Sequence, residues 1–171
     1  MTSHRRGLSH VDDDGRARMV DVGAKPVTAR HAAAEGAIRM SLEAFKLVKA
    51  NRIAKGDVLR VAEIAGIGGA KRTAELIPLC HPLPLDRISV ECTLDAKLPG
   101  VRVRAEAKVE AKTGVEMEAL TACAVALLTV YDMVKAADRE MTISDIRLIR
   151  KSGGRSGTFV AVTNPASVRR R

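Results

Sequence analysis

The sequence predicts an α+β fold, an antiparallel sheet packed against helices on one face. Two stretches with alternating apolar residues, 88–94 and 101–109, indicate neighbouring strands that each bury one face. The long apolar segment 115–137 indicates a helix that is buried on most sides. With the further elements below, the order is strand, helix, strand, strand, helix, strand, which is typical of ferredoxin-like domains.

The N-terminal part of this fold is less clearly patterned. Short strands are expected at 19–22 and 34–40. Ser41 can cap a helix that follows it, and Asp57 can open a second helix. The glycine pair 68–69 weakens that second helix, and indicates a kink, a close backbone approach or a boundary between two helices.

The C-terminal part completes the sheet. Pro99 and Gly100 supply a turn between the two alternating strands, which makes them a hairpin. A main strand is expected at 143–149 and a short edge strand at 159–162. Because the alternation leaves one face of the sheet apolar, the helices should cover that face alone.

The composition predicts an aliphatic core and an anionic partner. The 171 residues are 46% hydrophobic, with no Trp, one Tyr and two Phe. The net charge of +9 favours phosphorylated small molecules or nucleic acid. RNA binding on a sheet requires exposed aromatic rings for stacking. The aromatic residues of this chain are scattered, so we expect no nucleic-acid partner.

Cysteine usage and the apolar runs predict the cellular location of the protein. Three cysteines without a Cys-x-x-Cys pattern predict reduced thiols and a cytoplasmic location. Residues 1–18 lack the apolar centre of a secretory signal. The apolar run 119–134 is shorter than a typical spanning helix and contains Asp132, so no membrane partner is expected. The four histidines are scattered, and we expect no metal site.

The segment Leu-Ile-Pro-Leu-Cys-His-Pro-Leu at 76–83 holds a thiol and an imidazole between two prolines. Pro78 fixes its own φ, and Pro82 restrains His81 to extended backbone angles. His81 can transfer protons near neutral pH, although a loop histidine can instead cap a carbonyl. Cys80 is better explained by packing or substrate contact than as a nucleophile.

Four ionisable residues mark the two ends of the long predicted helix. Glu116 and Glu118 lie in its first turn, where carboxylates complement the helix dipole or line a site. Asp132 and Lys135 interrupt the apolar stretch about one turn apart. A buried ion pair is one explanation, but it is a costly way to hold a helix, and a functional site explains the pair better.

Glu118 and Asp132 are too far apart for one small pocket within one chain. They are separated by 14 residues, which is about 40° around a helix and roughly 21 Å along it. A site that uses both residues therefore needs two subunits, each lending one end of its helix. The spacing predicts an obligate homo-oligomer with composite sites.

Basic residues elsewhere indicate binding of phosphate groups. Lys55 stands beside the start of the second helix, and the pair 71–72, Lys-Arg, precedes the Cys-His loop. The segment 151–157, Lys-Ser-Gly-Gly-Arg-Ser-Gly, is suited to cradle phosphate, although a solvated loop explains it equally well. It lacks the spacing of a P-loop. Arg30 adds to the same positive surface.

Several of these segments together resemble one enzyme family. They are 55–58 (Lys-Gly-Asp-Val), 70–73 (Ala-Lys-Arg-Thr), 76–83, 112–121 (Lys-Thr-Gly-Val-Glu-Met-Glu-Ala-Leu-Thr), 131–133 (Tyr-Asp-Met) and 151–154 (Lys-Ser-Gly-Gly). Over most of its length, the chain closely resembles the cyclic pyranopterin monophosphate synthase family, also called molybdenum cofactor biosynthesis accessory protein C.

The resemblance implies a lyase of molybdenum cofactor (molybdopterin) biosynthesis. Its substrate would be (8S)-3′,8-cyclo-7,8-dihydroguanosine 5′-triphosphate, and its products cyclic pyranopterin monophosphate and pyrophosphate. The family is similar in its ferredoxin-like fold and forms a homohexamer, a trimer of dimers with shared sites. No resident cofactor is implied, and whether Mg²⁺ accompanies the triphosphate is left open. A non-catalytic nucleotide-sensing oligomer is the alternative, but it leaves Asp132 and Lys135 unexplained.

Matching positions carry the family's site residues over to this chain. Asp132 matches the catalytic aspartate, and Lys55 and Lys135 match catalytic lysines. We assign Asp132 and Lys135 to a coupled acid–base pair, Lys55 to a second proton donor, and His81 to substrate orientation with proton transfer. The substrate contacts implied by the match are Leu79, Cys80, His81, Met117 and Glu118.

Further substrate-binding residues are expected because the reaction develops negative charge. Expulsion of pyrophosphate develops negative charge, which nearby cations can stabilise. The further substrate-binding residues that we expect are Glu116, Lys71, Arg72, Lys151 and Arg30. The layout is a flexible N-terminal arm at 1–18, a single catalytic domain at 19–162 and a basic C-terminal tail at 163–171.

Overall fold

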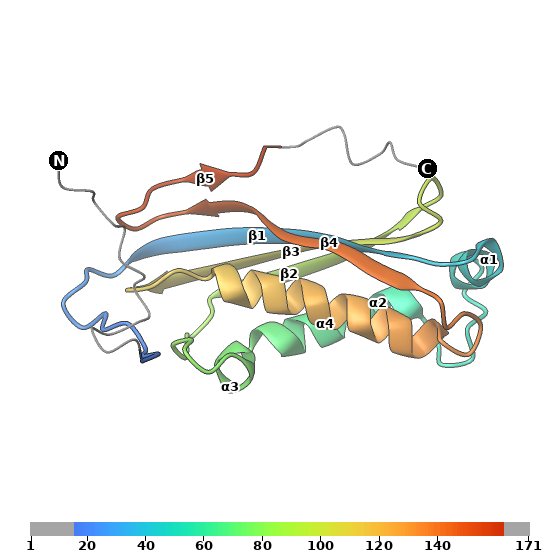
Figure 1. Ribbon diagram of the computed structural model, residues 1–171, viewed down its shortest axis with the longest axis horizontal. Coiled ribbons are helices and arrows are strands. Elements are labelled where there is room, and N and C mark those ends of the chain that lie inside the picture. Colours follow the sequence, from blue (N-terminus) through green and yellow to red (C-terminus); the bar gives the residue numbers. More distant parts are fainter. Residues whose placement is uncertain (1–15, 163–171) are drawn as a thin grey trace.

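A five-stranded antiparallel sheet forms the centre of the computed structural model, which describes residues 16–162 (Figure 1). The strands lie in the order β2-β3-β1-β4-β5. Their bounds are Thr28–Arg39 (β1), Arg87–Asp95 (β2), Gly100–Ala111 (β3), Thr142–Ser152 (β4) and Phe159–Val160 (β5). The helices of the described part are α1 (Leu42–Lys49), α2 (Val58–Ala70), α3 (Thr73–Leu76) and α4 (Glu116–Val134).

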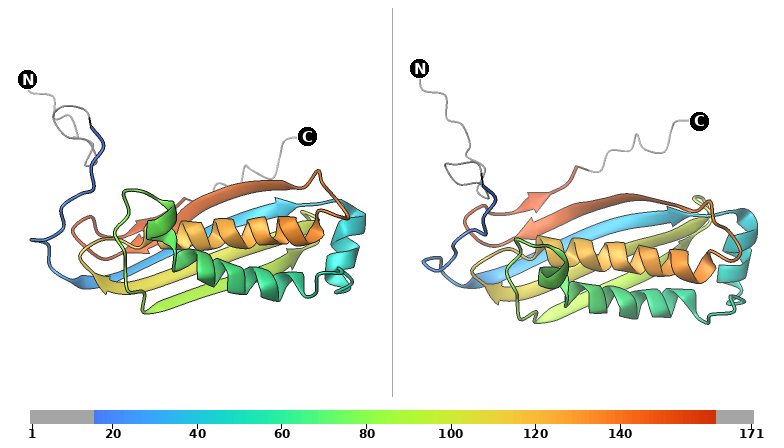
Figure 2. Two further views of the ribbon diagram at one scale, coloured as in Figure 1. Left: turned by 90° about the horizontal axis from the view of Figure 1, so that it is seen from below. Right: turned by 60° about the horizontal axis from the view of Figure 1, so that its bottom comes forward.

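The helices cover one face of the sheet, as the sequence predicts. In Figure 2, α2 and α4 lie side by side in front of the sheet and run in opposite directions, while α1 lies at one end. The core between the two layers is built almost entirely from Ala, Val, Ile, Leu and Met side chains, with Phe45 at its edge. The predicted α+β fold with an aliphatic core is confirmed.

The central strand β1 begins earlier than expected. The predicted strand at 34–40 is part of Thr28–Arg39, which pairs with β3 on one side and β4 on the other. Pairing with β3 from residue 28 and with β4 from residue 31 holds this segment extended although its local pattern is weak. Gly36 lies against Leu127 and Cys123 of α4, so its missing side chain lets helix and sheet approach closely.

The short strand expected at 19–22 is wrong. Residues 19–22 form no ladder of backbone hydrogen bonds with another strand. The segment turns instead at Gly23, whose N–H donates to Asp21 Oδ1 over 2.8 Å. Lys112 Nζ donates to the Gly23 carbonyl over 2.6 Å and fastens the turn to the loop before α4. Side-chain contacts therefore hold this segment in place of strand pairing.

Both predicted helix caps are present. Ser41 Oγ accepts from Ala44 N over 3.2 Å, and Asp57 Oδ1 accepts from Arg60 N over 3.1 Å. The glycine pair 68–69 lies inside the single helix α2, and Gly69 packs directly against Val125 of α4. Close backbone approach is therefore confirmed, and a boundary between two helices is wrong.

The remaining boundaries shift by a few residues. Helix α4 ends at Val134 rather than at residue 137, and β4 extends beyond 143–149 in both directions. The short helix α3 was not expected. Most of the predicted arm and the whole predicted tail, 163–171, lie outside the described residues.

Helix α4 is long and apolar enough to cross a membrane by length and composition alone. Its most apolar window is 56% buried against the rest of the fold, and core helices of globular proteins pass the same test. Ten of its residues are buried, so its apolar character is explained by the sheet and α2 that it covers.

Candidate active site

Lys55, Asp132 and Lys135, here called the Asp132 cluster, meet at the C-terminal end of α4. Asp132 Oδ2 accepts from Lys55 Nζ over 2.7 Å, and Oδ1 lies 2.7 Å from Lys135 Nζ. Lys55 Nζ also donates to the backbone carbonyl of Asp132 over 2.9 Å. The cluster therefore holds one carboxylate between two ammonium groups.

The local fold brings Lys55 to this position. Because α2 and α4 run in opposite directions, the residues before α2 lie beside the end of α4 (Figure 2). Gly56 has φ +102°, a backbone angle that favours glycine, and its N–H donates to the Ile53 carbonyl over 3.0 Å. This turn places Lys55 outside the helix, and Asp57 then caps α2.

The Asp132 cluster is exposed and positively charged overall. Its three side chains are 50–55% exposed, so a self-sufficient buried ion pair of Asp132 and Lys135 is the wrong explanation. Hydrogen bonds from Lys135 first, and then from Lys55, lower the pKa of Asp132 to about 2. Asp132 is therefore ionised at neutral pH. Two cations around one anion leave a net positive charge that suits an anionic ligand.

Glu118 is the centre of a second group, at the N-terminal end of α4. We call Arg30, Cys80, Glu116, Glu118 and Lys151 the Glu118 cluster. Glu118 is only 4% exposed. Burial raises its pKa, and the nearby charge of Glu116 raises it further, against a lowering by its own backbone N–H. Burial first, and then the charge of Glu118, also raise the pKa of the Cys80 thiol.

The raised pKa of Cys80 keeps it a neutral thiol. A thiol needs a lowered pKa to act as a nucleophile at neutral pH. Its N–H donates to the Ile77 carbonyl over 3.0 Å, which turns the loop toward Glu118. Packing or substrate contact therefore explains Cys80 better than nucleophilic attack, in agreement with the sequence.

Lys151 links the end of β4 to the first turn of α4. Its Nζ lies 3.2 Å from Glu116 Oε1 and donates to Ser156 Oγ over 2.6 Å. Both side chains of the ion pair are mostly shielded, with 24% exposure for Lys151 and 29% for Glu116. Glu116 therefore forms an ion pair with Lys151 in addition to complementing the helix dipole. Ser156 belongs to the predicted phosphate-binding segment 151–157, but its contact with Lys151 was not predicted.

Arg30 occupies the space beneath the glycine loop that follows β4. Its Nε and Nη2 donate to the carbonyls of Ala111 and Lys112, each over 3.3 Å. Gly154 lies directly against the Arg30 guanidinium, where a Cβ would have no room. Arg30 thus joins the loop before α4 to the glycine loop, and its guanidinium meets no carboxylate within residues 16–162.

The other predicted site residues surround the Glu118 cluster or precede it in the chain. Met117 lies in the first turn of α4, and Leu79 is next to Cys80. His81 is half-buried, and within residues 16–162 its imidazole has no hydrogen bond, so carbonyl capping is not observed. Lys71 and Arg72 are exposed between α2 and α3, ahead of this loop.

Two separate clusters therefore divide the predicted residues. Both are attached to α4, and Glu118 and Asp132 are roughly 21 Å apart along it. Lys55 and Lys135 come together with Asp132, and Cys80, Glu116 and Lys151 lie near Glu118. Arg30 joins this end of α4 through the loop before it. The Lys55–Asp132 contact was not predicted, because no spacing in the sequence indicates that the turn before α2 lies beside the end of α4.

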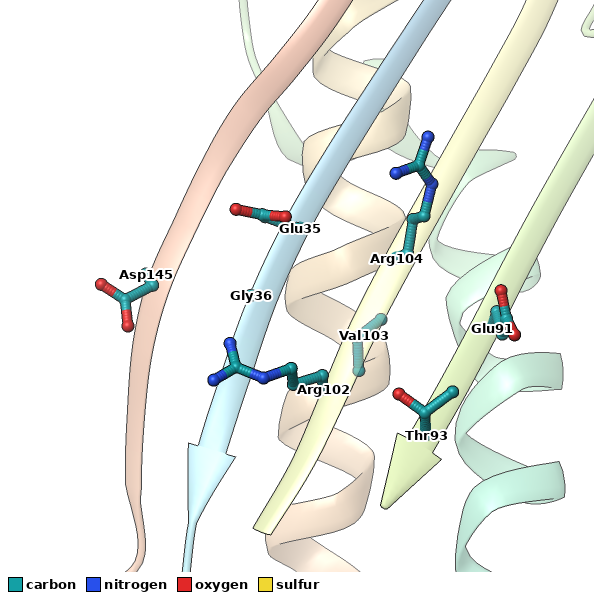
Figure 3. Close-up of a pocket in the computed structure, with 8 residues that line it drawn as sticks. All are labelled: Glu35, Gly36, Glu91, Thr93, Arg102, Val103, Arg104 and Asp145. Atoms are coloured by element: carbon teal, nitrogen blue, oxygen red, sulfur yellow. The ribbon is translucent and has the colours of Figure 1, made fainter. Parts of the chain in front are cut away.

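A hollow in the surface of the described residues lies away from both clusters. It measures about 210 Å³ and opens on the sheet face away from the helices (Figure 3). Its lining residues are Glu35, Gly36, Glu91, Thr93, Arg102, Val103, Arg104 and Asp145. None of them is a predicted site residue. Within residues 16–162, no group of three His, Cys, Asp or Glu side chains is placed to hold a metal ion.

Two groups of ionisable side chains lie at the two ends of α4. Such groups are typical of an enzyme that moves protons on an anionic substrate. Residues 19–154 match the sequence profile of the MoaC family, and the chain belongs to that family. This places it among the lyases of molybdenum cofactor biosynthesis.

Curated relatives support the same assignment. The cyclic pyranopterin monophosphate synthase of Cereibacter sphaeroides (strain KD131 / KCTC 12085) is 61% identical over 155 residues, 91% of this chain and 98% of the relative. The protein of the same name from Brucella melitensis biotype 2 is 57% identical over 162 residues, 95% of this chain and 98% of the relative. That from Methylobacterium sp. (strain 4-46) is 60% identical over 154 residues, 90% of this chain and 96% of the relative.

Proposed function

We propose that this protein converts (8S)-3′,8-cyclo-7,8-dihydroguanosine 5′-triphosphate to cyclic pyranopterin monophosphate and releases pyrophosphate. The observation that carries the proposal is the Asp132 cluster, where one carboxylate fixes two lysine ammonium groups at 2.7 Å. Membership of the MoaC family and relatives named for this product support it. The catalytic domain comprises residues 19–162.

The reaction needs proton transfers and stabilisation of phosphate charge. Opening the five-membered ring of the purine and building the pyrazine ring both require donors and acceptors at the same nucleotide. Lys55 and Lys135 supply protons, and the ionised Asp132 holds both ammonium groups in position. The Glu118 cluster binds the other side of the substrate, where Lys151 and Arg30 offset charge that develops as pyrophosphate leaves.

His81 and its neighbours complete the substrate contacts. His81 orients the nucleotide and transfers a proton, and Leu79, Cys80 and Met117 line the site beside Glu118 and Glu116. The exposed Lys71 and Arg72 add positive charge along the approach to the loop. The proposal includes no resident cofactor and leaves open whether Mg²⁺ accompanies the triphosphate.

A complete site forms between two protomers, and the assembly is a hexamer arranged as a trimer of dimers. The roughly 21 Å between Glu118 and Asp132 supports sharing, because one nucleotide cannot span both clusters of one chain comfortably. The protein works in the cytoplasm. Its three free cysteines support a reducing compartment.

Purified protein supplied with the cyclised triphosphate tests the reaction. We expect release of pyrophosphate and formation of the cyclic monophosphate, and loss of both in Asp132→Asn and Lys135→Ala with assembly retained. Binding of the triphosphate without turnover would instead support a nucleotide sensor and refute the proposal.

Mixing two inactive variants tests the sharing of sites. Asp132→Asn and Lys151→Ala each disable a different cluster. If sites are shared, about half of randomly mixed dimers are heterodimers, and each heterodimer has one intact site of two. Mixing and reassembly should therefore restore about a quarter of the wild-type turnover. No recovery after proven subunit exchange would show that each chain carries its own site.

A further inference from the structure

Helix α1 lies at the end of the molecule where α4 ends and α2 begins (Figure 2). It has eight residues and buries one side, Ala44, Phe45 and Val48, against the core. Helices shorter than about 12 residues are marginal on their own, so the position of α1 depends on contacts at its ends as well as on this packing. Both of its ends connect to the Asp132 cluster.

Asp138, in the loop after α4, fastens the start of α1. Its Oδ2 accepts from the N–H of Ser41 over 2.7 Å, and its Oδ1 accepts from the N–H of Glu140 over 2.9 Å. The hydrogen bond from Ser41, and then the one from Glu140, lower the pKa of Asp138, so its carboxylate is ionised at neutral pH. Hydrogen bonds to an ionised acceptor are about twice as strong as those between neutral groups.

The loop that carries Asp138 is itself held to the last turn of α4. The N–H of Asp138 donates to the Val134 carbonyl over 3.2 Å, which folds the loop back on the helix. Tyr131 Oη donates to the Arg139 carbonyl over 3.1 Å. Asp132 belongs to this same last turn of α4. These contacts therefore fix Asp138 relative to Asp132.

The other end of α1 leads to Lys55 through a closely bonded turn. The N–H of Arg52 donates to the Leu47 carbonyl over 2.9 Å, and that of Asn51 donates to the Val48 carbonyl over 3.0 Å. Asn51 has φ +52°, the left-handed angle that ends a helix in this bonding pattern. The glycine turn before α2 follows directly, so a shift of α1 is passed on to Lys55.

We infer that Asp138 is a positioning residue of the active site: by fastening the start of α1 to the loop after α4, it holds Lys55 against Asp132. The inference rests on the proposed catalytic role of Lys55. Asp138 acts through the main chain of α1 and the segment 50–54, not by contact with the substrate. Lys55 Nζ lies 2.7 Å from Asp132 Oδ2, and a shift of about 1 Å would take this pair beyond hydrogen-bond distance.

The pKa of Asp132 measures this positioning without any substrate. Lys135 and Lys55 hold it at about 2, so withdrawal of Lys55 raises it toward the ordinary 3.8. We expect Asp138→Ala to raise the pKa of Asp132. Asp138→Asn keeps one acceptor oxygen, and its effect should lie between those of Asp138→Ala and the wild type. NMR titration measures the shift, and an unchanged pKa of Asp132 in Asp138→Ala would overturn the inference.

Asp95 supplies the matched control. In the hairpin between β2 and β3, its Oδ1 accepts from two loop N–H groups over 2.8 and 3.2 Å, and its Oδ2 accepts from Arg102 over 2.6 Å. Asp95→Ala therefore removes two backbone contacts, as Asp138→Ala does, and an ion pair in addition. We expect it to lower the melting temperature at least as much and to leave the pKa of Asp132 and kcat unchanged. An equal rise of this pKa in both variants would show a general loosening of the fold and would refute the specific role of Asp138.

Turnover gives a second measurement. Loss of positioning should lower kcat about tenfold with little change in KM, because the substrate contacts near Glu118 lie at the other end of α4. In a Lys55→Met background, Asp138 has no catalytic ammonium group left to hold against Asp132. Adding Asp138→Ala to Lys55→Met should therefore lower kcat no further. A further tenfold loss in the double variant would show that Asp138 does not act through Lys55.

The two proposals can fail separately. If the wild-type protein releases no pyrophosphate but Asp138→Ala raises the pKa of Asp132, the positioning stands and the proposed reaction falls. If the wild-type protein turns over and Asp138→Ala changes neither this pKa nor kcat, the reaction stands and the inference falls.

Discussion

Lys55 reaches Asp132 across 77 positions of the chain and contacts it twice, at the carboxylate over 2.7 Å and at the backbone carbonyl over 2.9 Å. The second contact ties the ammonium group to the helix end itself. The carbonyls at a helix C-terminus carry partial negative charge and favour a cation. Lys55 is therefore held in place by main chain and side chain together.

Removing this cation should reduce turnover with little effect on folding. We expect Lys55→Met to lower kcat by about 100-fold or more, because one positioned proton donor is lost. The pKa of Asp132 should rise from its value of about 2, since Lys55 is one of the two lysines that lower it. Steady-state kinetics and NMR titration of Asp132 measure the two effects. Lys49→Met, an exposed lysine at the end of α1, serves as the control and should leave kcat unchanged.

Gly154 and Gly157 offer a matched pair of substitutions in the loop after β4. Both have positive φ, +71° and +65°, so Ala at either position costs about 1–2 kcal/mol of backbone strain. Only at Gly154 would the new Cβ meet the Arg30 guanidinium. We expect Gly154→Ala to raise KM about tenfold through displacement of Arg30 and the loop. Equal KM values for Gly154→Ala and Gly157→Ala would contradict a role for this contact.

Alanine substitutions at Gly68 and Gly69 of α2 distinguish the effect of packing on stability from the effect of helix propensity. A Cβ at Gly69 would lie 2.7 Å from a methyl group of Val125, whereas a Cβ at Gly68 meets nothing within 4 Å. Gly69→Ala should destabilise the fold by about 1–3 kcal/mol through overpacking. Gly68→Ala should stabilise it by up to about 1 kcal/mol. Urea unfolding measures both, and the prediction is wrong if the two variants shift in the same direction.

Burial of Glu118 gives stability a defined dependence on pH. Its folded-state pKa is raised above the ordinary 4.5, so the folded protein holds this proton more tightly than the unfolded chain. The free energy of unfolding should therefore fall as pH rises from about 4.5 through the raised pKa. Glu118→Gln removes this contribution. Unfolding of both proteins across this range should show their difference widening with pH, and parallel curves would exclude a raised pKa.

Regular patterns in the sequence were sufficient for most of the fold. Alternation over 88–94 and 101–109 predicts β2 and β3, because every second side chain of these strands faces the core. The long apolar run predicts α4, because the core covers most of this helix. Strand β1 was only partly predicted. Its central place between β3 and β4 supplies the stabilisation, and that contribution is invisible in a local window.

The site was predictable in its residues and less so in its arrangement. The separation of Glu118 from Asp132 follows from helix geometry, and the structure retains it because α4 is one continuous helix. The exposure of Asp132 was not predictable from the apolar residues around it. It depends on where α2 begins beside the end of α4, which only the packed structure reveals.

The unbroken course of α4 makes the length of this helix a fixed quantity for the enzyme. Each added residue turns one end relative to the other by about 100° and moves it by about 1.5 Å. One insertion between Glu118 and Asp132 would carry Asp132 away from Lys55, or Glu118 away from Cys80. We expect loops of this protein to accept changes in length during evolution, and the 19 residues of α4 to accept none.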